Sequence, residues 1–197
     1  MQPEWSMSDS LKEVTFKNEI SKLGLNDGDT LVDIGCYTGY HDFQLFNFYP
    51  NKFFILEDIR YWNDKRMKVA CVMIDGQKKF FINNSTRLIG DKQSIPLGSG
   101  KYKTVYCCRV LHEFEFPYAM IDELNRIMSV NGILIIEESI PRVEGEIDAG
   151  CKKRRLTKKE IIDLITPHGF FLISSDTTTW KLTEDNYRNL NILRFRK

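Results

Sequence analysis

Residues 30–39, which read Thr-Leu-Val-Asp-Ile-Gly-Cys-Tyr-Thr-Gly, decide the fold. A short apolar run, interrupted only by Asp33, passes directly into a turn that contains Gly35 and Gly39. An apolar run of this length that is bounded by turn residues predicts a buried strand. A glycine turn between a strand and a helix lets backbone amides approach a ligand closely. Because ligands of open α/β sheets bind at the carboxyl ends of the strands, this turn is predicted to hold one.

Strands and helices alternate on both sides of this turn. Further strands are predicted at 52–56, 86–89, 103–108, 132–137, 170–174 and 191–195, and helices at 8–25, 40–48, 60–68, 117–128 and 157–166. Uninterrupted apolar runs suit strands that are covered on both faces. No helix separates the last two strands, so they are expected to pair antiparallel. The prediction is one α/β domain over 1–197, a doubly wound, seven-stranded, mostly parallel sheet with an antiparallel edge hairpin and helices on both faces.

Three segments depart from this plain alternation. Residues 1–28 are expected to form an N-terminal helical segment. Residues 69–85 contain two β-rich runs around Asp75-Gly76-Gln77 and predict a hairpin insertion. Residues 138–156 follow a strand and are expected to form a lid over the substrate.

Composition excludes several classes of protein. An aromatic share of 12% excludes disorder, and a formal net charge of +1 gives no general attraction to nucleic acid or to anionic membranes. The five cysteines contain no Cys-x-x-Cys pair, so neither a metal site nor a disulfide framework is predicted. The first residues lack the apolar stretch of a signal peptide, and no run approaches the roughly 20 apolar residues of a membrane helix. We therefore expect a cytoplasmic protein without membrane contact; the sequence specifies no oligomeric state.

The stretch 31–39 resembles the nucleotide-binding loop of class I S-adenosylmethionine (SAM) methyltransferases, in which three alternating glycines follow an acid. Asp33, Gly35 and Gly39 match that pattern, and Tyr37 replaces the middle glycine. Stretches similar to later parts of the family follow in the family's order at 87–114, 122–138 and 155–174. The dinucleotide fingerprint of nicotinamide dehydrogenases would instead need glycine at Tyr37 and Tyr40, which disfavours that class.

The resemblance implies SAM as the cofactor and assigns the residues that hold it. The implied cofactor-binding residues are Asp33, Gly35, Cys36, Tyr37 and Gly39 in the loop, Glu57 or Asp58 at the ribose, Asp91 at the adenine, and Cys108 and Arg109 beside the sulfonium. The sequence leaves the choice between Glu57 and Asp58 open.

His112 and Glu113, which follow the strand at 103–108, are the candidate catalytic bases. The family often reads Leu-His-His at this place, so Leu111-His112-Glu113 is a near match. The ordinary pKa of histidine lies close to neutrality, which suits a group that accepts a proton from the methyl acceptor.

The sequence thus predicts a SAM-dependent methyltransferase with a small-molecule acceptor. Nucleic acid is not expected as a partner, because the chain shows no recognition domain and no extended basic face. Two alternatives stay open. One is a non-catalytic SAM-binding or regulatory protein, suggested by Tyr37 and Arg109. The other is an RNA methyltransferase, in which the basic residues 152–155 would contact phosphate.

Overall fold

Seven strands form a single sheet in the computed structural model, which describes residues 9–59, 83–181 and 187–197. The strands are β1 (Thr30–Ile34), β2 (Phe53–Asp58), β3 (Ser85–Ile89), β4 (Tyr102–Cys108), β5 (Met128–Ser139), β6 (Phe171–Lys181) and β7 (Tyr187–Arg196). The helices are α1 (Asp9–Leu23), α2 (Tyr40–Phe46), α5 (Pro117–Ile127) and α6 (Lys158–Ile165), with short 3-10 turns η2 (Leu111–Glu113) and η3 (Thr166–His168).

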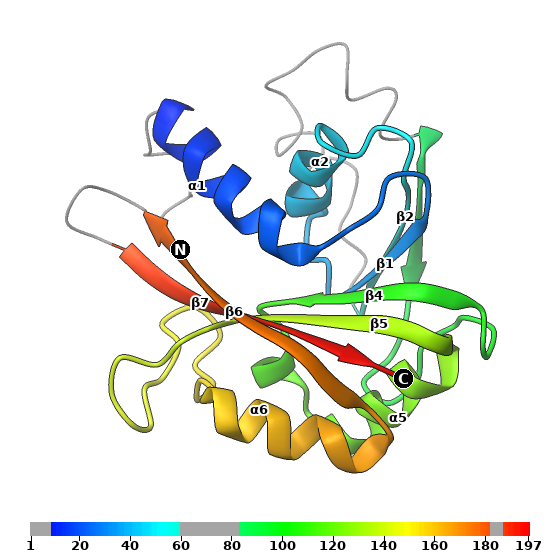
Figure 1. Ribbon diagram of the computed structural model, residues 1–197. Coiled ribbons are helices and arrows are strands. Elements are labelled where there is room, and N and C mark those ends of the chain that lie inside the picture. The colour runs from blue at the N-terminus through cyan, green and yellow to red at the C-terminus, as the bar shows by residue number, and fades with distance from the viewer. Residues whose placement is uncertain (1–8, 60–82, 182–186) are drawn as a thin grey trace.

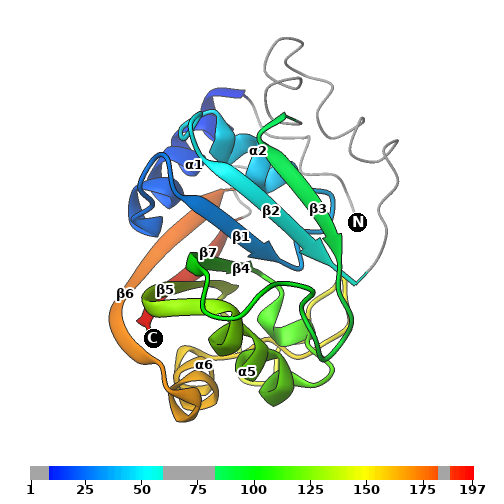
Figure 2. The ribbon, with the colours of Figure 1, turned by 90° about the vertical axis from the view of Figure 1, so that its right-hand side faces the viewer.

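The strand order is β3-β2-β1-β4-β5-β7-β6. Strands β1 to β5 run parallel, whereas β7 lies antiparallel between β5 and β6. Figure 2 shows β1, β2 and β3 side by side in one half of the sheet. The chain order reverses between β1 and β4, and such a switch point leaves a crevice at the carboxyl ends of the strands. The predicted fold, including its antiparallel edge pair, is confirmed.

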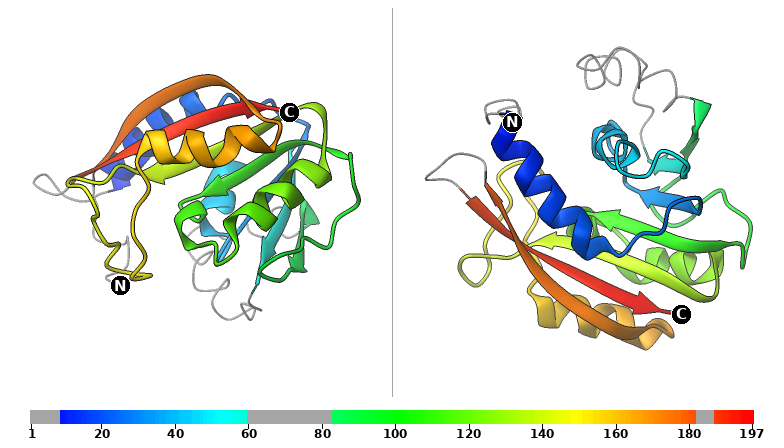
Figure 3. Two further views of the ribbon diagram at one scale, coloured as in Figure 1. Left: turned by 90° about the horizontal axis from the view of Figure 1, so that it is seen from below. Right: turned by 45° about the horizontal axis from the view of Figure 1, so that its top comes forward.

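Each face of the sheet carries its own core, because alternate residues of a buried strand point to opposite sides. Leu31 packs in the core with α1 and α2, whereas its neighbour Val32 packs in the core with α5 and α6. Figure 1 shows these two helix pairs on opposite sides of the sheet. Seen from below, α5 and α6 cover one face, and the loop between β5 and α6 extends beyond the sheet (Figure 3). Within the described ranges, no helix is long and apolar enough to cross a membrane.

The strands extend beyond the runs that sequence patterns predict. β6 continues from the predicted 170–174 as far as Lys181, and β7 begins at Tyr187 rather than at residue 191. The added part of β6 is rich in serine and threonine, and pairing with β7, as in Thr177↔Asn191, supplies the backbone bonds that its polar sequence does not predict. The helix expected at 60–68 and almost all of the hairpin expected at 69–85 lie outside the described residues.

Helix α6 begins with a capping box. The amide of Glu160 donates to Thr157 Oγ1 (3.2 Å), and the Thr157 amide donates to Glu160 Oε2 (2.8 Å). Removing such a cap costs about 1 kcal/mol. Thr157→Ala is therefore expected to lower the free energy of unfolding by about 1 kcal/mol, measured by urea denaturation. Lys158→Ala, at the exposed neighbouring position, is the control, and an equal loss in both variants would contradict this assignment.

Candidate active site

The turn after β1 has a left-handed backbone at Gly35 (φ 72°), Tyr37 (φ 53°) and Gly39 (φ 73°). Gly35 has a second reason to be glycine, because a Cβ there would lie 2.3 Å from Cγ2 of Val110. The amides of Gly35 and Cys36 both donate to the carbonyl of Glu57, at 2.8 and 3.0 Å. These bonds fasten the turn to the end of β2 and leave it between the ends of β2 and β4.

Tyr37 occupies the place of the family's middle glycine, and its side chain does not block the turn. A left-handed conformation costs a non-glycine residue roughly 1–2 kcal/mol. The amide of Tyr37 donates to Oδ2 of Asp58 (2.9 Å), and this bond offsets part of that cost. The side chain is 45% exposed, so the ring lies toward solvent.

A pair of buried carboxyl groups, Asp33 and Asp42, lies beneath this turn. Asp33 is 1% exposed, and its Oδ1 has no hydrogen-bond partner among the described residues. Burial, together with the charge of Asp42, raises the pKa of Asp33 well above its usual range. Burial also raises the pKa of Asp42 to about 6. Two buried carboxyls that interact in this way retain a proton near neutral pH. A cation placed beside Asp33 would displace that proton.

The two acids at the end of β2 lie in different surroundings. Glu57 is 1% exposed and lies against Gly90, where a Cβ would lie only 1.8 Å from Glu57 Oε1. Burial and the charge of Asp58 raise the pKa of Glu57 to about 7, although the amides of Gly35 and Gly90 lower it. Asp58 is half-buried and binds the Tyr37 amide at the outside of the turn. Of the two, Asp58 is the more exposed.

Asp91 follows β3 and organises the turn that it starts. Its Oδ1 accepts from the amides of Gln93 and Ser94, both at 2.7 Å, and its Oδ2 accepts from the Ser94 hydroxyl at 2.7 Å. These bonds lower the pKa of Asp91. An open pocket of about 540 Å³ borders this turn and is lined by Ile59, Gly90, Asp91, Lys92, Gln93 and Phe116.

Cys108 and Arg109, at the end of β4, contact a buried acid, Glu137, that is not among the predicted site residues. Glu137 is fully buried at the end of the adjacent strand; its Oε2 accepts from the Tyr106 hydroxyl (2.8 Å) and its Oε1 from the Cys108 thiol (3.5 Å). Arg109 Nε lies 3.6 Å from Oε1 of Glu137. The Nε edge of the Arg109 guanidinium therefore faces Glu137. The available signal was the pair of acids that closes the apolar run 132–138.

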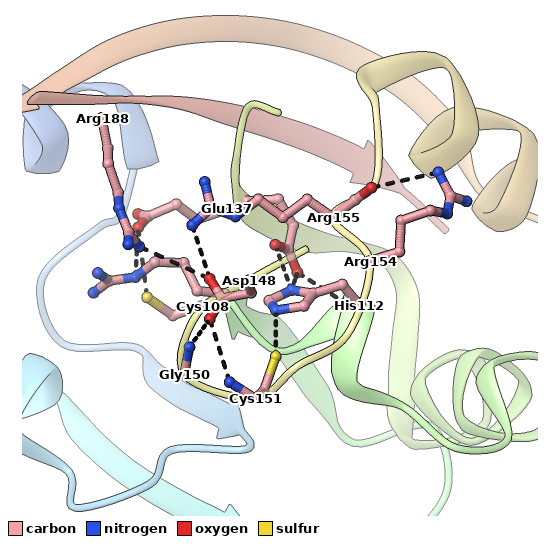
Figure 4. Close-up of polar contacts among 11 residues, drawn as sticks. Cys108, His112, Glu137, Asp148, Gly150, Cys151, Arg154, Arg155 and Arg188 are labelled. Carbon is pink, nitrogen blue, oxygen red and sulfur yellow. Dashed lines mark hydrogen bonds and ion pairs between the residues drawn. The ribbon is translucent and has the colours of Figure 1, made fainter. Parts of the chain in front are cut away.

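His112 and Glu113 lie in η2, where the structure brings Cys151 to them. His112 Nδ1 is 2.8 Å from Oε2 of Glu138, and Cys151 Sγ is 3.4 Å from Nε2 on the other side of the ring (Figure 4). Burial lowers the pKa of His112, but the bond to Glu138 and the surrounding acids raise it more, so the net shift is upward. Burial raises the pKa of Glu113. The role of these two residues as catalytic bases stays a prediction.

The loop at 140–157, which holds Cys151, is organised by ion pairs of its own. Arg155 is 4% exposed and binds Glu146 (3.1 Å) and Asp148 (2.9 Å). Burial raises the pKa of Asp148, but hydrogen bonds from Gly150, Arg155 and Cys151 bring it down to about 2. The first two residues of the expected lid belong to β5. The lid function itself stays a prediction.

Stability is expected to depend on pH through Glu57. Its folded pKa of about 7 lies above the ordinary 4.5, so its protonated form favours folding, and this contribution is lost as the pH rises through 7. Glu57→Gln imitates the protonated form. It is expected to raise the free energy of unfolding at pH 8, relative to wild type, by on the order of 1–3 kcal/mol more than it does at pH 5.

Urea denaturation at both pH values measures this difference. Comparing one variant across pH cancels any constant change in packing. The exposed Glu144→Gln serves as the control. An effect of Glu57→Gln that is the same at pH 5 and pH 8 would contradict the assignment.

Solved structures share the fold across nearly the whole chain. The [4+2]-cyclase SpnF superimposes with a TM-score of 0.74 at 14% identity, covering 100% of this chain and 85% of that one. A SAM-dependent methyltransferase from Aquifex aeolicus gives a TM-score of 0.69 at 14% identity, covering 94% and 96%. At such identities the likeness shows the fold.

Curated relatives correct the expected partner. The tRNA U34 carboxymethyltransferase of Campylobacter curvus is 25% identical over 125 residues, which cover 61% of this chain and 38% of the relative. The chain thus spans about two fifths of the length of the relatives it matches. These relatives carry tRNA in their name. The expectation of a small-molecule substrate, with nucleic acid not expected as a partner, is therefore wrong. It rested on the apparent lack of a recognition domain and of an extended basic face.

A family model described as a methyltransferase domain matches residues 25–191. This range begins before β1 and ends within β7, so it contains the glycine turn and all of the site described above. The match confirms the prediction of a class I SAM-dependent methyltransferase, with SAM as its cofactor. The chain belongs to the methyltransferase-domain family.

Proposed function

We propose that the protein transfers a methyl group from SAM to an RNA acceptor, with tRNA as the first candidate. The observation that carries the RNA acceptor is a group of arginines, contributed by separate elements, at the carboxyl end of the sheet. The names of the curated relatives support the same acceptor. The two halves of the proposal, cofactor and acceptor, rest on different residues.

The residues around the glycine turn fit the chemical groups of SAM. Asp33 offers a buried carboxylate oxygen for the ammonium group, and the turn at 35–39 offers close backbone for the methionine carboxylate. Asp58, the more exposed of the two acids at the end of β2, would accept from the ribose hydroxyls. The open pocket beside Asp91 would take the adenine. When bound, SAM supplies a methyl group that is already activated on a sulfonium.

Arginines from three elements gather at the acceptor side. Arg109 follows β4, Arg142 lies just after β5, and Arg188 lies at the start of β7, which is antiparallel to β5 and so begins at the same edge. Burial lowers the pKa of Arg188, and the positive charges of Arg155, Arg109 and Arg142 lower it further. Asp148, whose Oδ2 lies 3.9 Å from Nη1 of Arg188, raises it. These guanidinium groups therefore lie within electrostatic range of one another. We call Arg109, Arg142 and Arg188 the arginine rim.

The arginine rim has the chemistry of a phosphate contact. Guanidinium groups bind phosphate oxygens in pairs, and phosphate contacts supply most of the affinity of proteins for nucleic acid. Lys152, Lys153 and Arg154 extend the basic surface along the exposed part of the loop at 140–157. Arg155, in contrast, is buried in ion pairs within that loop. The basic residues of the site are thus spread over several elements, which a net charge of +1 conceals.

Transfer of labelled methyl groups tests the proposal directly. The protein is incubated with SAM carrying a tritiated methyl group and with bulk tRNA, and the RNA is then precipitated and counted. We expect label in RNA. Mass spectrometry of the digested nucleosides then identifies the methylated base. Saturable SAM binding without transfer to tRNA or to total cellular RNA would instead favour the non-catalytic alternative.

Arg142→Ala and Arg188→Ala are each expected to weaken RNA binding by up to about tenfold and to lower the slope of log affinity against log salt by about 1. Affinity for SAM should stay unchanged. Fluorescence anisotropy of labelled tRNA at several salt concentrations measures both quantities. Arg196→Ala, exposed at the opposite end of β7, is the matched control. Equal losses of RNA affinity in Arg196→Ala and Arg188→Ala would contradict the assignment of the arginine rim to phosphate binding.

A further inference from the structure

We propose that His112, Glu113 and Cys151 form a zinc-binding site that fastens the loop at 140–157 to the end of β4. The three side chains offer an imidazole nitrogen, a carboxylate oxygen and a thiol sulfur, which are the ligand types of protein zinc sites. One ligand atom from each lies within 4.8 Å of the other two. This site goes beyond methyl transfer and does not depend on the identity of the acceptor. It makes His112 and Glu113 metal ligands in place of the catalytic bases that the sequence predicts.

The spacing of the ligand atoms corresponds to a shared metal ion. Cys151 Sγ lies 3.4 Å from His112 Nε2. Tetrahedral zinc with bonds of about 2.3 Å to sulfur and about 2.0 Å to nitrogen places these two atoms roughly 3.5 Å apart. Glu113 is the exposed member of the group. Three protein ligands leave a fourth position for water.

His112 is oriented as zinc-bound histidines are. The carboxylate of Glu138 lies 2.8 Å from Nδ1, and it also accepts from the backbone amide of His112 at 3.2 Å. Glu138 is itself fully buried. A carboxylate on the outer nitrogen fixes the ring and turns the lone pair of Nε2 toward the metal.

Cys151 is held in place by the tight turn that carries it. Asp148 Oδ1 accepts from the amides of Gly150 (2.7 Å) and Cys151 (3.3 Å), and Arg155 in turn binds Asp148. Figure 4 shows these bonds, with the Cys151 sulfur directed at the His112 ring. Because the turn is fixed by its own bonds, the thiol is in position before a metal binds.

The surrounding charge favours a cation over a nucleophilic cysteine. Glu113, Glu138 and Asp148 all act on His112, and Glu113 and Asp148 also act on Cys151, so an isolated thiolate would face negative neighbours. The described residues hold a second group of metal-ligand types, His41, Cys108 and Glu137. There, however, Glu137 already accepts from Tyr106 and Cys108 and faces the guanidinium of Arg109, which opposes a metal ion. We therefore assign zinc to His112, Glu113 and Cys151 alone.

Zinc binding is tested on the whole protein by competition with a chromophoric chelator after metal removal, with stoichiometry from elemental analysis. We expect one zinc ion per chain. Cys151→Ser and His112→Ala should each weaken binding by about a hundredfold or more, and Glu138→Gln by about tenfold. Cys108→Ser should leave it unchanged. Cobalt(II) should give a sulfur-to-metal charge-transfer band in the wild type that Cys151→Ser abolishes.

Three results would overturn the assignment: no stoichiometric zinc, binding that survives both Cys151→Ser and His112→Ala, or loss of zinc in Cys108→Ser. Near-ultraviolet circular dichroism checks the fold of each variant. If His112→Ala does not fold, Cys151→Ser and the exposed Glu113→Gln carry the test. Metal content is read without any substrate, so failure of methyl transfer and failure of zinc binding remain distinct results.

Discussion

The site depends on the close approach of the turn after β1 to the end of β4. Gly35 lies against Val110 so tightly that no other residue fits, and the same turn is bonded through two amides to the carbonyl of Glu57 at the end of β2. Because these contacts join three strand ends, they set the distance between the glycine turn and the residues that follow β4. Those residues include Arg109 and, in the next turn, His112.

Five buried acids lie at or beside these strand ends, and their burial costs stability. Asp33, Asp42, Glu57, Glu137 and Glu138 are all at most 1% exposed. The protein holds them in different ways: Asp33 with Asp42, and Glu57, retain protons near neutral pH, Glu137 takes hydroxyl and thiol donors, and Glu138 binds His112. Proteins break the rule against buried charge mainly at functional sites. This concentration of acids marks the carboxyl edge of the sheet as the working surface.

The sequence pattern was sufficient for the fold and for the glycine turn after β1, because both depend on local signals. A buried strand with glycines after it predicts β1 and its turn, and Thr157 with Glu160 predicts the start of α6. The pattern did not determine how Tyr37 is accommodated, and the bond from its backbone amide to Asp58 shows how the turn forms without a middle glycine.

The sequence pattern could not predict contacts between segments that are distant in the chain. Cys151 reaches His112 across 39 residues of chain, so the spacing of cysteines gave no sign of a ligand group. Arg109, Arg142 and Arg188 become neighbours only when β7 inserts beside β5. Which of Glu57 and Asp58 is buried at the end of β2 depends on the packing of Gly90 against Glu57. In each case tertiary packing, which sequence periodicity does not encode, decides the chemistry.

Calorimetric titration with SAM tests the central claim that the glycine turn after β1, with Asp33 and Asp58, forms the cofactor site. We predict saturable binding of SAM to the wild type and no binding of NADH. We also predict that Asp58→Asn loses about tenfold or more in SAM affinity, since a charge-assisted bond to a hydroxyl is worth roughly 1.5–3 kcal/mol, and that Glu57→Gln changes SAM affinity little. A wild type that does not bind SAM, or variants that respond in the reverse order, would contradict it.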